Sequence, residues 1–453
     1  MTDHTSHHTL AARSLKAVWH PCTQMKLHET APPIAISRAE GVWLHGVDGR
    51  RYLDGVSSWW VNLFGHSHPH IRAALVDQLG RLDHIMLAGF THEPVVALSE
   101  KLAALTGLGH ASYASDGASA TEIALKMSAH YWRNMGRPEK CQFVGVAGGY
   151  HGETVGALAV TDIALFREAY APLVRLAAIV PSPDARQALP TDTGKPGHPG
   201  ESAVDVAERA AQALEHWLDQ HHSRTAALIV EPLVQCAAGM AMHDPHYLRR
   251  ARALCDHYNI HLVVDEIATG FGRTGTMFAH QQAGIRPDFI CLSKGLTGGT
   301  LPLSAVLTTD AVYAAFYDDS VARGFLHSHS YTGNPLACRA ALATLELFDQ
   351  TNALVNNQTL AAQLTAAFAP LSQHPRVTHA RHLGMIWAWD VRSTLPNFSR
   401  RYHQHALAYG VLLRPIGHTL YAMPPYLMDD EAVAHLAQGA LAALHATLAE
   451  EHA

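Results

Sequence analysis

Two chemically active side chains follow apolar stretches of this sequence. Asp265 closes the stretch HLVVDE (261–266), and Lys294 comes directly after DFICLS (288–293). The interval between them has the length of one strand–helix–strand unit. If both stretches are parallel strands, their carboxyl ends meet at one edge of the sheet, where ligands bind. We therefore expect an acid and an amine to converge there, although a structural salt bridge between them is the simpler alternative.

An acid and a lysine at one sheet edge suit pyridoxal 5'-phosphate. A carboxylate, here Asp265, opposite the pyridine nitrogen keeps the ring cationic, and the cationic ring accepts electrons from the substrate. A lysine, here Lys294, forms a Schiff base with the cofactor and afterwards moves a proton between the substrate carbon and the cofactor. The pair predicts an enzyme that acts on amines.

Two further blocks contain groups that such a cofactor needs. In YASDGASATEIALKMSAHYW, apolar residues recur at helical spacing after Gly117 and Ala118, so the free N–H groups of a helix start can bind a phosphate. An ordinary capped helix start is the alternative. In AGGYHGET, Tyr150 follows an apolar stretch and two glycines, and its ring can lie on a planar cofactor or be buried in the core.

Two other motifs point elsewhere and carry less weight. GFGRTG fits the dinucleotide fingerprint, but Asp265 and Glu266 precede it, and their charge would repel a pyrophosphate. HSHPH places His66, His68 and His70 at alternate positions, where three imidazoles suit a metal. Because the chain has 34 histidines, a surface loop is the better interpretation, and we expect no metal site.

The elements that position these residues alternate along the chain. We expect strands at 142–149, 226–232, 261–266 and 288–293, with helices between them such as 246–259, and this order favours a mainly parallel sheet covered on both faces. Two short strands flank the turn at Asp48 and Gly49. Helical spacing is also found at 71–80, at 92–106 and from about residue 340. Residues 1–40 are expected to form an irregular arm, and 181–203 a surface loop inside the large domain.

Composition limits the remaining possibilities. The chain has 453 residues, 48% of them hydrophobic, and this length suggests two or three domains. Its net charge of −6 without a basic run argues against nucleic-acid partners. No run of about 18 apolar residues and no apolar leader stand out, so we expect a cytoplasmic protein without membrane spans. The six scattered cysteines are expected to be reduced.

Taken together, the motifs resemble the class III (omega) aminotransferases, which depend on pyridoxal phosphate and have fold type I. The resemblance rests on VVDEIATGFGRTG, SKGLTGGTLPLSA, IVEPLVQ, YTGNPLAC, WHPCTQM, DGVSSWWVNLFGHSHP, GYHGET and LLRPIGHTLYAMPPY, and it runs from about Trp19 to the end of the chain. It implies a large domain over residues 81–345 with a seven-stranded sheet. A smaller α/β domain would combine an N-terminal segment (1–80) with residues 346–453.

The resemblance also implies the site residues. Catalytic roles fall to Lys294 and Tyr150. Cofactor contacts are expected from Lys294, Asp265, Gly117, Ala118, Tyr150, His329 and Ser330, with Ser330 reaching the phosphate from the neighbouring subunit of a homodimer. Substrate contacts are expected from Trp59, Tyr150, Lys294, Ser328, Arg414, Tyr421 and Cys22. If Trp59 and Trp60 lie on an extended segment, only one of them faces the pocket. The resemblance favours Trp59 for this position and leaves Trp60 as a core anchor.

The branch of the class with these motifs transfers an amino group to 8-amino-7-oxononanoate in biotin biosynthesis, by a ping-pong reaction. The implied partners are therefore small molecules, namely this keto acid and an amino donor, S-adenosyl-L-methionine. Arg414 would hold the acceptor's carboxylate. Cys22 stands where the branch has a tyrosine, and cysteine offers neither that aromatic wall nor a phenol, so lysine remains open as donor. Another omega-aminotransferase, or a non-catalytic protein that binds the cofactor, is the alternative.

Overall fold

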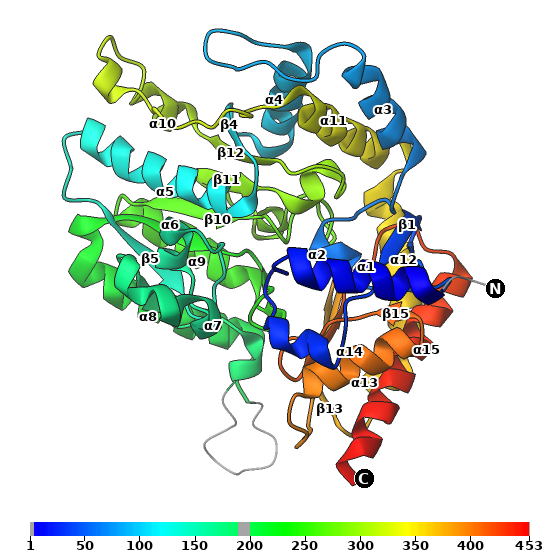
Figure 1. The fold of residues 1–453 in the computed structure, drawn as a ribbon. Coiled ribbons are helices and arrows are strands. Elements are labelled where there is room, and N and C mark those ends of the chain that lie inside the picture. The colour runs from blue at the N-terminus through cyan, green and yellow to red at the C-terminus, as the bar shows by residue number, and fades with distance from the viewer. Residues whose placement is uncertain (1–3, 189–199, 453) are drawn as a thin grey trace.

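The computed structural model describes residues 4–188 and 200–452, and a seven-stranded sheet lies at its centre (Figure 1). Its strand order is β4 (His110–Ala114), β12 (Ser304–Thr308), β11 (Phe289–Leu292), β10 (His261–Asp265), β7 (Thr225–Val230), β5 (Gln142–Val146) and β6 (Ala178–Val180). Within this sheet, β12 alone runs against its neighbours. The predicted mainly parallel α/β fold is confirmed.

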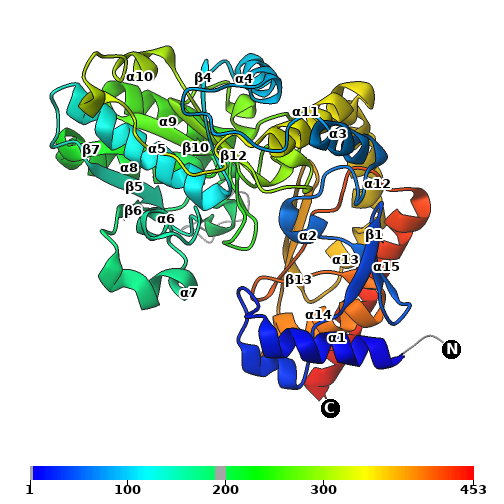
Figure 2. The same cartoon turned by 45° about the horizontal axis from the view of Figure 1, so that its top comes forward.

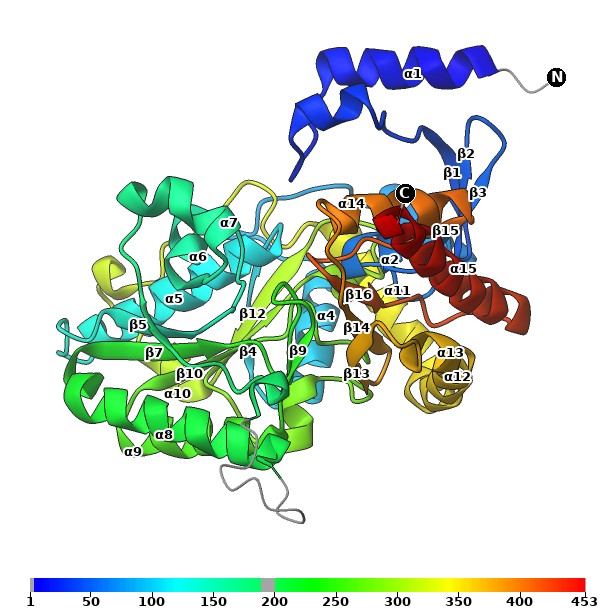
Figure 3. The same ribbon diagram turned by 90° about the horizontal axis from the view of Figure 1, so that it is seen from below.

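Helices cover both faces of this sheet. Figure 3 shows α5 (Gly117–Asn134) and α6 (Val155–Val160) on one face, and α8 (Ala203–His221) and α9 (Pro245–His257) on the other. A strand between two helical layers has no solvent-facing side, and every residue of β7 is indeed buried. This double cover explains why the strands read as continuous apolar stretches in the sequence.

A second group of elements combines the two ends of the chain. One sheet has the order β1 (Ile36–Glu40), β2 (Trp43–Gly46), β3 (Arg51–Asp54) and β15 (Val411–Leu412), so a strand from near residue 411 pairs with one from near residue 53. Another consists of β13 (Val377–Leu383), β14 (Ile386–Val391) and β16 (Thr419–Ala422). Figure 2 shows this group beside the large sheet.

The remaining helices pack around these sheets. They are α2 (Ser57–Trp60), α3 (Pro69–Leu79), α4 (Glu93–Thr106), α7 (Ala164–Arg167), α10 (Asp310–Ala314), α11 (Pro335–Gln350), α12 (Ala353–Ala367), α13 (Ala369–Ser372), α14 (Phe398–Ala408) and α15 (Asp430–Ala449), with a short ribbon of β8 (Val234–Gln235) and β9 (Ala241–Met242). By length and composition α15 is apolar enough to cross a membrane. However, one side of it packs on α12 and α14, as in the core helix of a globular protein.

Two expectations about irregular segments met different outcomes. The prediction of an irregular arm over 1–40 is wrong in part, because residues His4–Ala17 form the helix α1. This stretch contains no proline or glycine, so nothing in it breaks a helix. The expected loop at 181–203 contains a short 3₁₀ helix at Ala185–Gln187. Its residues 189–199 lie outside the described part of the chain.

Candidate active site

A cavity of about 280 Å³ lies at the carboxyl edge of the large sheet. Its lining comes from the ends of several elements: Trp60, Asp116, Gly117, Ala118, Tyr150, His151, Gly152, Glu153, Glu231, Asp265, Ile267, Ala268 and Lys294. Strands β10 and β11 are parallel neighbours, and Asp265 is in register with Cys291, three residues before Lys294. The predicted convergence of the acid and the amine is therefore present.

The carboxylate of Asp265 is fixed in place and 3% exposed. Its Oδ1 accepts the backbone N–H of Ile267 at 3.0 Å, and its Oδ2 lies 2.7 Å from Nδ1 of His151. The Nε2 atom of the buried His151 has no partner in the described part of the chain. Each oxygen of the carboxylate thus already has one partner from the protein, so its orientation is set before any ligand binds.

Lys294 reaches the cavity from a backbone in the left-handed region, with φ of +44°. Such a conformation is rare for a side-chain-bearing residue and is concentrated at functional sites. Burial lowers the pKa of Lys294, while Asp265 opposes this shift. Its Nζ lies 5.0 Å from the centre of the Trp60 ring. A lowered pKa increases the fraction of free amine, the form of lysine that acts as nucleophile and base.

Tyr150 forms one wall of the cavity and is held at both ends. Its backbone N–H donates to Oε2 of Glu231 at 3.0 Å, and its hydroxyl donates to Oε1 of Glu153 at 2.8 Å. Burial, followed by the effect of Glu153, raises the pKa of the Tyr150 phenol. Burial also raises the pKa of Glu231 to about 7. The tyrosine ring is therefore a neutral, oriented surface.

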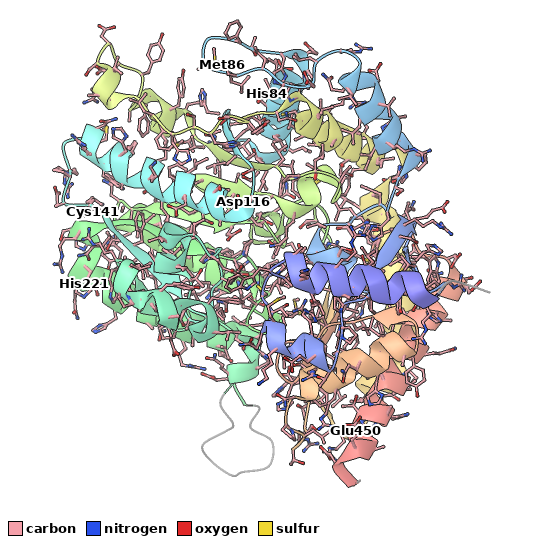
Figure 4. All side chains as sticks on the ribbon, viewed as in Figure 1. His84, Met86, Asp116, Cys141, His221 and Glu450 are labelled. Atoms are coloured by element: carbon pink, nitrogen blue, oxygen red, sulfur yellow. The ribbon has the colours of Figure 1, made fainter. Side chains whose placement is uncertain are left out.

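The amino end of α5 closes the opposite end of the cavity. Asp116 caps this helix, because its Oδ1 accepts the N–H of Ser119 at 2.9 Å (Figure 4). The N–H groups of Gly117 and Ala118 precede the first intrahelical bond and remain available. Gly152, with φ of +121°, lies so close that a Cβ there would collide with Cβ of Ala118. A helix start with free N–H groups and its positive dipole end is a place where a phosphate can bind.

Residues 57–60, here called the tryptophan turn, depart from the extended segment considered above. Ser57, Ser58, Trp59 and Trp60 all have positive φ, between +46° and +74°. A left-handed conformation costs about 1–2 kcal/mol per non-glycine residue, so contacts elsewhere must hold the turn. The expectation for Trp60 was incomplete, because its side chain lines the cavity and donates from Nε1 to the Tyr421 hydroxyl at 3.2 Å.

The other expected substrate residues lie beside this turn. Trp59 is 44% exposed, and the guanidinium carbon of Arg414 lies 5.2 Å from the centre of its ring. Cys22, which is exposed and has φ of +48°, is 3.8 Å from Oε1 of Glu153, the atom that also accepts from Tyr150. Burial, then Glu153, raises the pKa of the Cys22 thiol. Cys22 and Arg414 also line a neighbouring cavity of about 580 Å³.

Three expected residues do not line the cavity of their own chain. Ser328, His329 and Ser330 lie on the segment between β12 and α11, where Ser328 and Ser330 are exposed. The backbone N–H of His329 is bound to Oγ1 of Thr332 at 3.1 Å. Within one described chain, this segment is therefore separate from the other site residues.

Several lining residues had not been singled out from the sequence. These are His151, Glu153 and Glu231, together with Asp116. Glu231 had a signal, because it ends the apolar stretch AALIVEP just as Asp265 ends HLVVDE. His151 and Glu153 follow Tyr150 within GYHGET, but neither has a local pattern that separates it from a surface residue.

The three histidines of HSHPH contact three different groups. His66 lies 2.9 Å from Asp54, His68 caps the start of α3, and His70 lies 2.6 Å from Glu346. In residues 4–188 and 200–452, no group of three histidine, cysteine or acidic side chains is placed to hold a metal ion. All six cysteines are free thiols.

Comparisons with known proteins agree with this arrangement. The family model "Aminotransferase class-III" matches residues 25–444. The adenosylmethionine-8-amino-7-oxononanoate aminotransferase of Helicobacter pylori is 43% identical over 94% of this chain and 95% of its own. The enzyme of the same name from Geobacter sulfurreducens is 36% identical over 96% of this chain and 97% of its own.

Solved structures show the same fold. A crystal structure of the enzyme of that name from Methanocaldococcus jannaschii has a TM-score of 0.88 and 31% identity, covering 98% of this chain and 99% of its own. An omega transaminase from Pseudomonas jessenii in complex with PMP has a TM-score of 0.89 and 25% identity, covering 97% and 98%.

The cavity fits the cofactor of this family. It offers an acid, an amine, an aromatic wall and free N–H groups at a helix start around one space, and these are the groups that a pyridine nitrogen, an aldehyde, a planar ring and a phosphate require. Pyridoxal 5'-phosphate is therefore the cofactor of an enzyme that transfers amino groups. By the length of the family match and by the identity to its relatives, this chain belongs to the class III aminotransferases.

Proposed function

We propose that this aminotransferase converts 8-amino-7-oxononanoate into 7,8-diaminononanoate, a step of biotin biosynthesis. The observation that carries the proposal is the position of Arg414, whose guanidinium carbon lies 5.2 Å from the ring centre of Trp59, the neighbour of the cavity residue Trp60. The acceptor has a carboxylate at the end of an aliphatic chain, and a guanidinium binds a carboxylate at two points. The names of the relatives, which act on this compound, support the same choice.

In this proposal the cofactor is held by residues at both ends of the cavity. Asp265 would pair with the pyridine nitrogen, Tyr150 would provide an aromatic wall for the ring, and the N–H groups of Gly117 and Ala118 would bind the phosphate; all four residues line the cavity. When bound, pyridoxal phosphate supplies an electron-accepting ring that stabilises negative charge on the carbon next to the amine. His151 keeps the Asp265 carboxylate in position through its bond to Oδ2.

Lys294 has the central catalytic role. Its amine would hold the cofactor through the aldehyde, and the free amine would take a proton from the substrate carbon and deliver it to the cofactor. Burial favours the neutral amine needed for this step. The nearby Trp60 ring and the buried Tyr421 hydroxyl exclude bulk water from this side of Lys294.

The acceptor and the donor share the entrance. The acceptor would contact Trp59, Arg414 and Tyr421, whose hydroxyl accepts from the cavity residue Trp60, and Ser328 would come from a second subunit. For the donor, Cys22 and Glu153 stand beside the Tyr150 hydroxyl, and we take S-adenosyl-L-methionine as the donor. Lysine is the alternative donor, since Cys22 leaves room where related enzymes have an aromatic ring.

We further propose a homodimer in which each subunit completes the other's site. The phosphate would then receive His329 and Ser330 of the second subunit. Exposed apolar side chains on two adjacent loops support this assembly: Met86, Phe90, Leu326 and Tyr331. The rings of His84 and Tyr331 are 4.8 Å apart, so the two loops touch, and Figure 4 shows His84 and Met86 at the rim of the molecule. Its partners would otherwise be small molecules, in the cytoplasm.

A different omega-aminotransferase activity is the second candidate. Its support is the similarity to the Pseudomonas jessenii omega transaminase, which has the same fold at lower identity. Such an enzyme would accept ketones or keto acids without needing Arg414 to bind a carboxylate at the far end of a long chain. A direct comparison of acceptors separates the two functions.

The deciding experiment measures the two half-reactions separately. The purified enzyme is mixed with S-adenosyl-L-methionine, lysine or a simple diamine, and loss of the absorbance of the lysine-bound cofactor identifies the donor. The aminated enzyme is then mixed with 8-amino-7-oxononanoate, and recovery of the absorbance identifies the acceptor. Lys294→Ala should abolish this absorbance and turnover, and turnover in that variant would refute the assignment.

A further inference from the structure

The tryptophan turn places two aromatic side chains at two different parts of the site. Trp60 lines the cavity and lies beside Lys294, whereas Trp59 points to the Arg414 guanidinium. Trp59 and Trp60 are consecutive residues of one short left-handed turn, so the backbone that positions one ring also positions the other. The geometry of the turn therefore couples the cofactor cavity to the entrance.

Asp54 is the residue that holds this turn. Asp54 is the last residue of strand β3, and it is 0% exposed. Its Oδ1 accepts the N–H of Ser58 at 2.9 Å, and its Oδ2 accepts the Ser58 hydroxyl at 2.7 Å. His66 Nε2 lies 2.9 Å from the same Oδ2 and fixes the carboxylate from the other side.

A second bond anchors the turn to the strand that carries Tyr421. The Ser57 hydroxyl donates to the carbonyl oxygen of Met423 at 2.7 Å, and Met423 N–H donates to Gly55 at 2.8 Å. These bonds fix where the turn starts. The bonds between Asp54 and Ser58 fix its direction, because they hold a residue inside the turn that has a left-handed backbone, with φ of +46°.

We propose that Asp54 is a positioning residue for the acceptor: through Ser58 it fixes the tryptophan turn, so that Trp59 holds the Arg414 guanidinium where the substrate's carboxylate arrives. This inference rests on the proposed role of Arg414. Asp54 touches neither substrate nor cofactor. Its contribution is the orientation of a cation by an aromatic face, which is worth most when the ring cannot move.

The test compares recognition of the carboxylate in matched variants. Asp54→Asn leaves one oxygen where the carboxylate has two, and Ser58→Ala deletes a single bond to Asp54. The control is Ser67→Ala: Ser67 is also a left-handed serine, with φ of +54°, and its hydroxyl donates to the carbonyl of Ala39 at 2.8 Å, away from the turn. For each protein, kcat/KM is measured for 8-amino-7-oxononanoate and for the corresponding aminoketone without the carboxyl group.

In the wild-type enzyme we expect strong preference for the keto acid. Since a misplacement of about 1 Å can cost 100-fold, this preference should fall roughly tenfold or more in Asp54→Asn and Ser58→Ala and stay unchanged in Ser67→Ala. A loss of folded protein lowers both rates equally and leaves the ratio intact. If Asp54→Asn does not fold, Ser58→Ala alone decides.

Two results would overturn different statements. If the wild type prefers the keto acid and Ser58→Ala keeps that preference in full, the positioning role of Asp54 is wrong. If the wild type shows no preference, the proposed acceptor is wrong. The turn is then assessed by near-ultraviolet circular dichroism, where the tryptophan bands should change in Ser58→Ala and not in Ser67→Ala, and unchanged bands in both would reject the inference.

Discussion

His151 and Asp265 form a buried pair in which Nδ1 of the imidazole lies 2.7 Å from Oδ2 of the carboxylate. His151 follows strand β5, and Asp265 is the last residue of β10. They lie close together because the carboxyl ends of these two strands are at the same edge of the sheet. With the Ile267 N–H on its other oxygen, Asp265 is held from two directions. In the proposed function, this pair orients the acid that would meet the pyridine nitrogen of the cofactor.

Removing the imidazole should therefore weaken cofactor binding. A hydrogen bond to a charged group contributes roughly 1.5–3 kcal/mol, so we expect His151→Ala to lower the affinity for pyridoxal phosphate by about tenfold or more. His151→Asn is the matched control, because its amide nitrogen occupies the position of Nδ1 and keeps the bond. Titration of cofactor-free enzyme, followed by absorbance, measures both. Equal affinity in the two variants would contradict the role of the bond.

Arg414→Lys tests whether the acceptor needs the planar guanidinium of Arg414 or only its positive charge. Lysine keeps the positive charge but not the planar fork that binds a carboxylate at two points or stacks on Trp59. The KM for 8-amino-7-oxononanoate should rise by about tenfold, which corresponds to one lost strong hydrogen bond. Arg38→Lys, at an exposed ion pair with Glu40, is the control and should leave KM unchanged. A normal KM in Arg414→Lys would remove Arg414 from the acceptor site.

Much of the site was predictable because its main residues end buried strands. Asp265 and Lys294 follow long apolar stretches, and in a parallel sheet this position alone brings them to one edge. Gly117 and Ala118 were predictable because the helical spacing after them marks a helix start. In each case a short stretch of sequence marks the end of a strand or the start of a helix, and the parallel arrangement of the strands then brings these ends together.

The tryptophan turn could not be predicted in the same way. Its four left-handed residues carry side chains, and the bonds that hold them come from Asp54, four residues before Ser58, and from Met423, which is far away in the chain. No local pattern marks such a turn, so an extended segment was the natural assumption, and Trp60 was expected only as a core residue. The role of residues 328–330 depends on a second subunit and stays a prediction.

Arg273 links three segments of the site, and its loss should destabilise the protein. Its side chain is 1% exposed, and its guanidinium donates to the carbonyl oxygens of Pro424 at 2.7 Å and Asn62 at 2.8 Å. Arg273→Met leaves these buried carbonyls without donors, and we expect a loss of about 3 kcal/mol in the free energy of unfolding. Arg286→Met, which removes one exposed bond to Gly107, should change it little. Chemical denaturation of the two variants compares them, and equal midpoints would contradict the prediction.

The buried Lys140 should make the stability of the folded protein depend on pH, independently of catalysis. It is 2% exposed, its Nζ donates to the carbonyl of Asn259, and the Trp132 ring lies 4.1 Å away. Burial lowers the pKa of Lys140 from 10.5 to about 8. Between these values the unfolded chain binds a proton that the folded protein has released. Because the unfolded state then holds more protons, the stability contributed at this position rises as the pH increases from about 8 to about 10.5.

Lys140→Met keeps the aliphatic stem and abolishes the titration. At pH 7 the variant should be more stable than the wild type by up to about 3 kcal/mol, less whatever the bond to Asn259 and the contact with Trp132 contribute, and this advantage should shrink towards pH 10. Thermal unfolding of both proteins from pH 7 to pH 10 measures the difference. Lys101→Met, at an exposed ion pair with Asp349, should show no such trend. A difference that stays constant across this range would mean that Lys140 keeps its ordinary pKa in the folded protein, so that the Trp132 face and the Asn259 carbonyl fully replace its hydration.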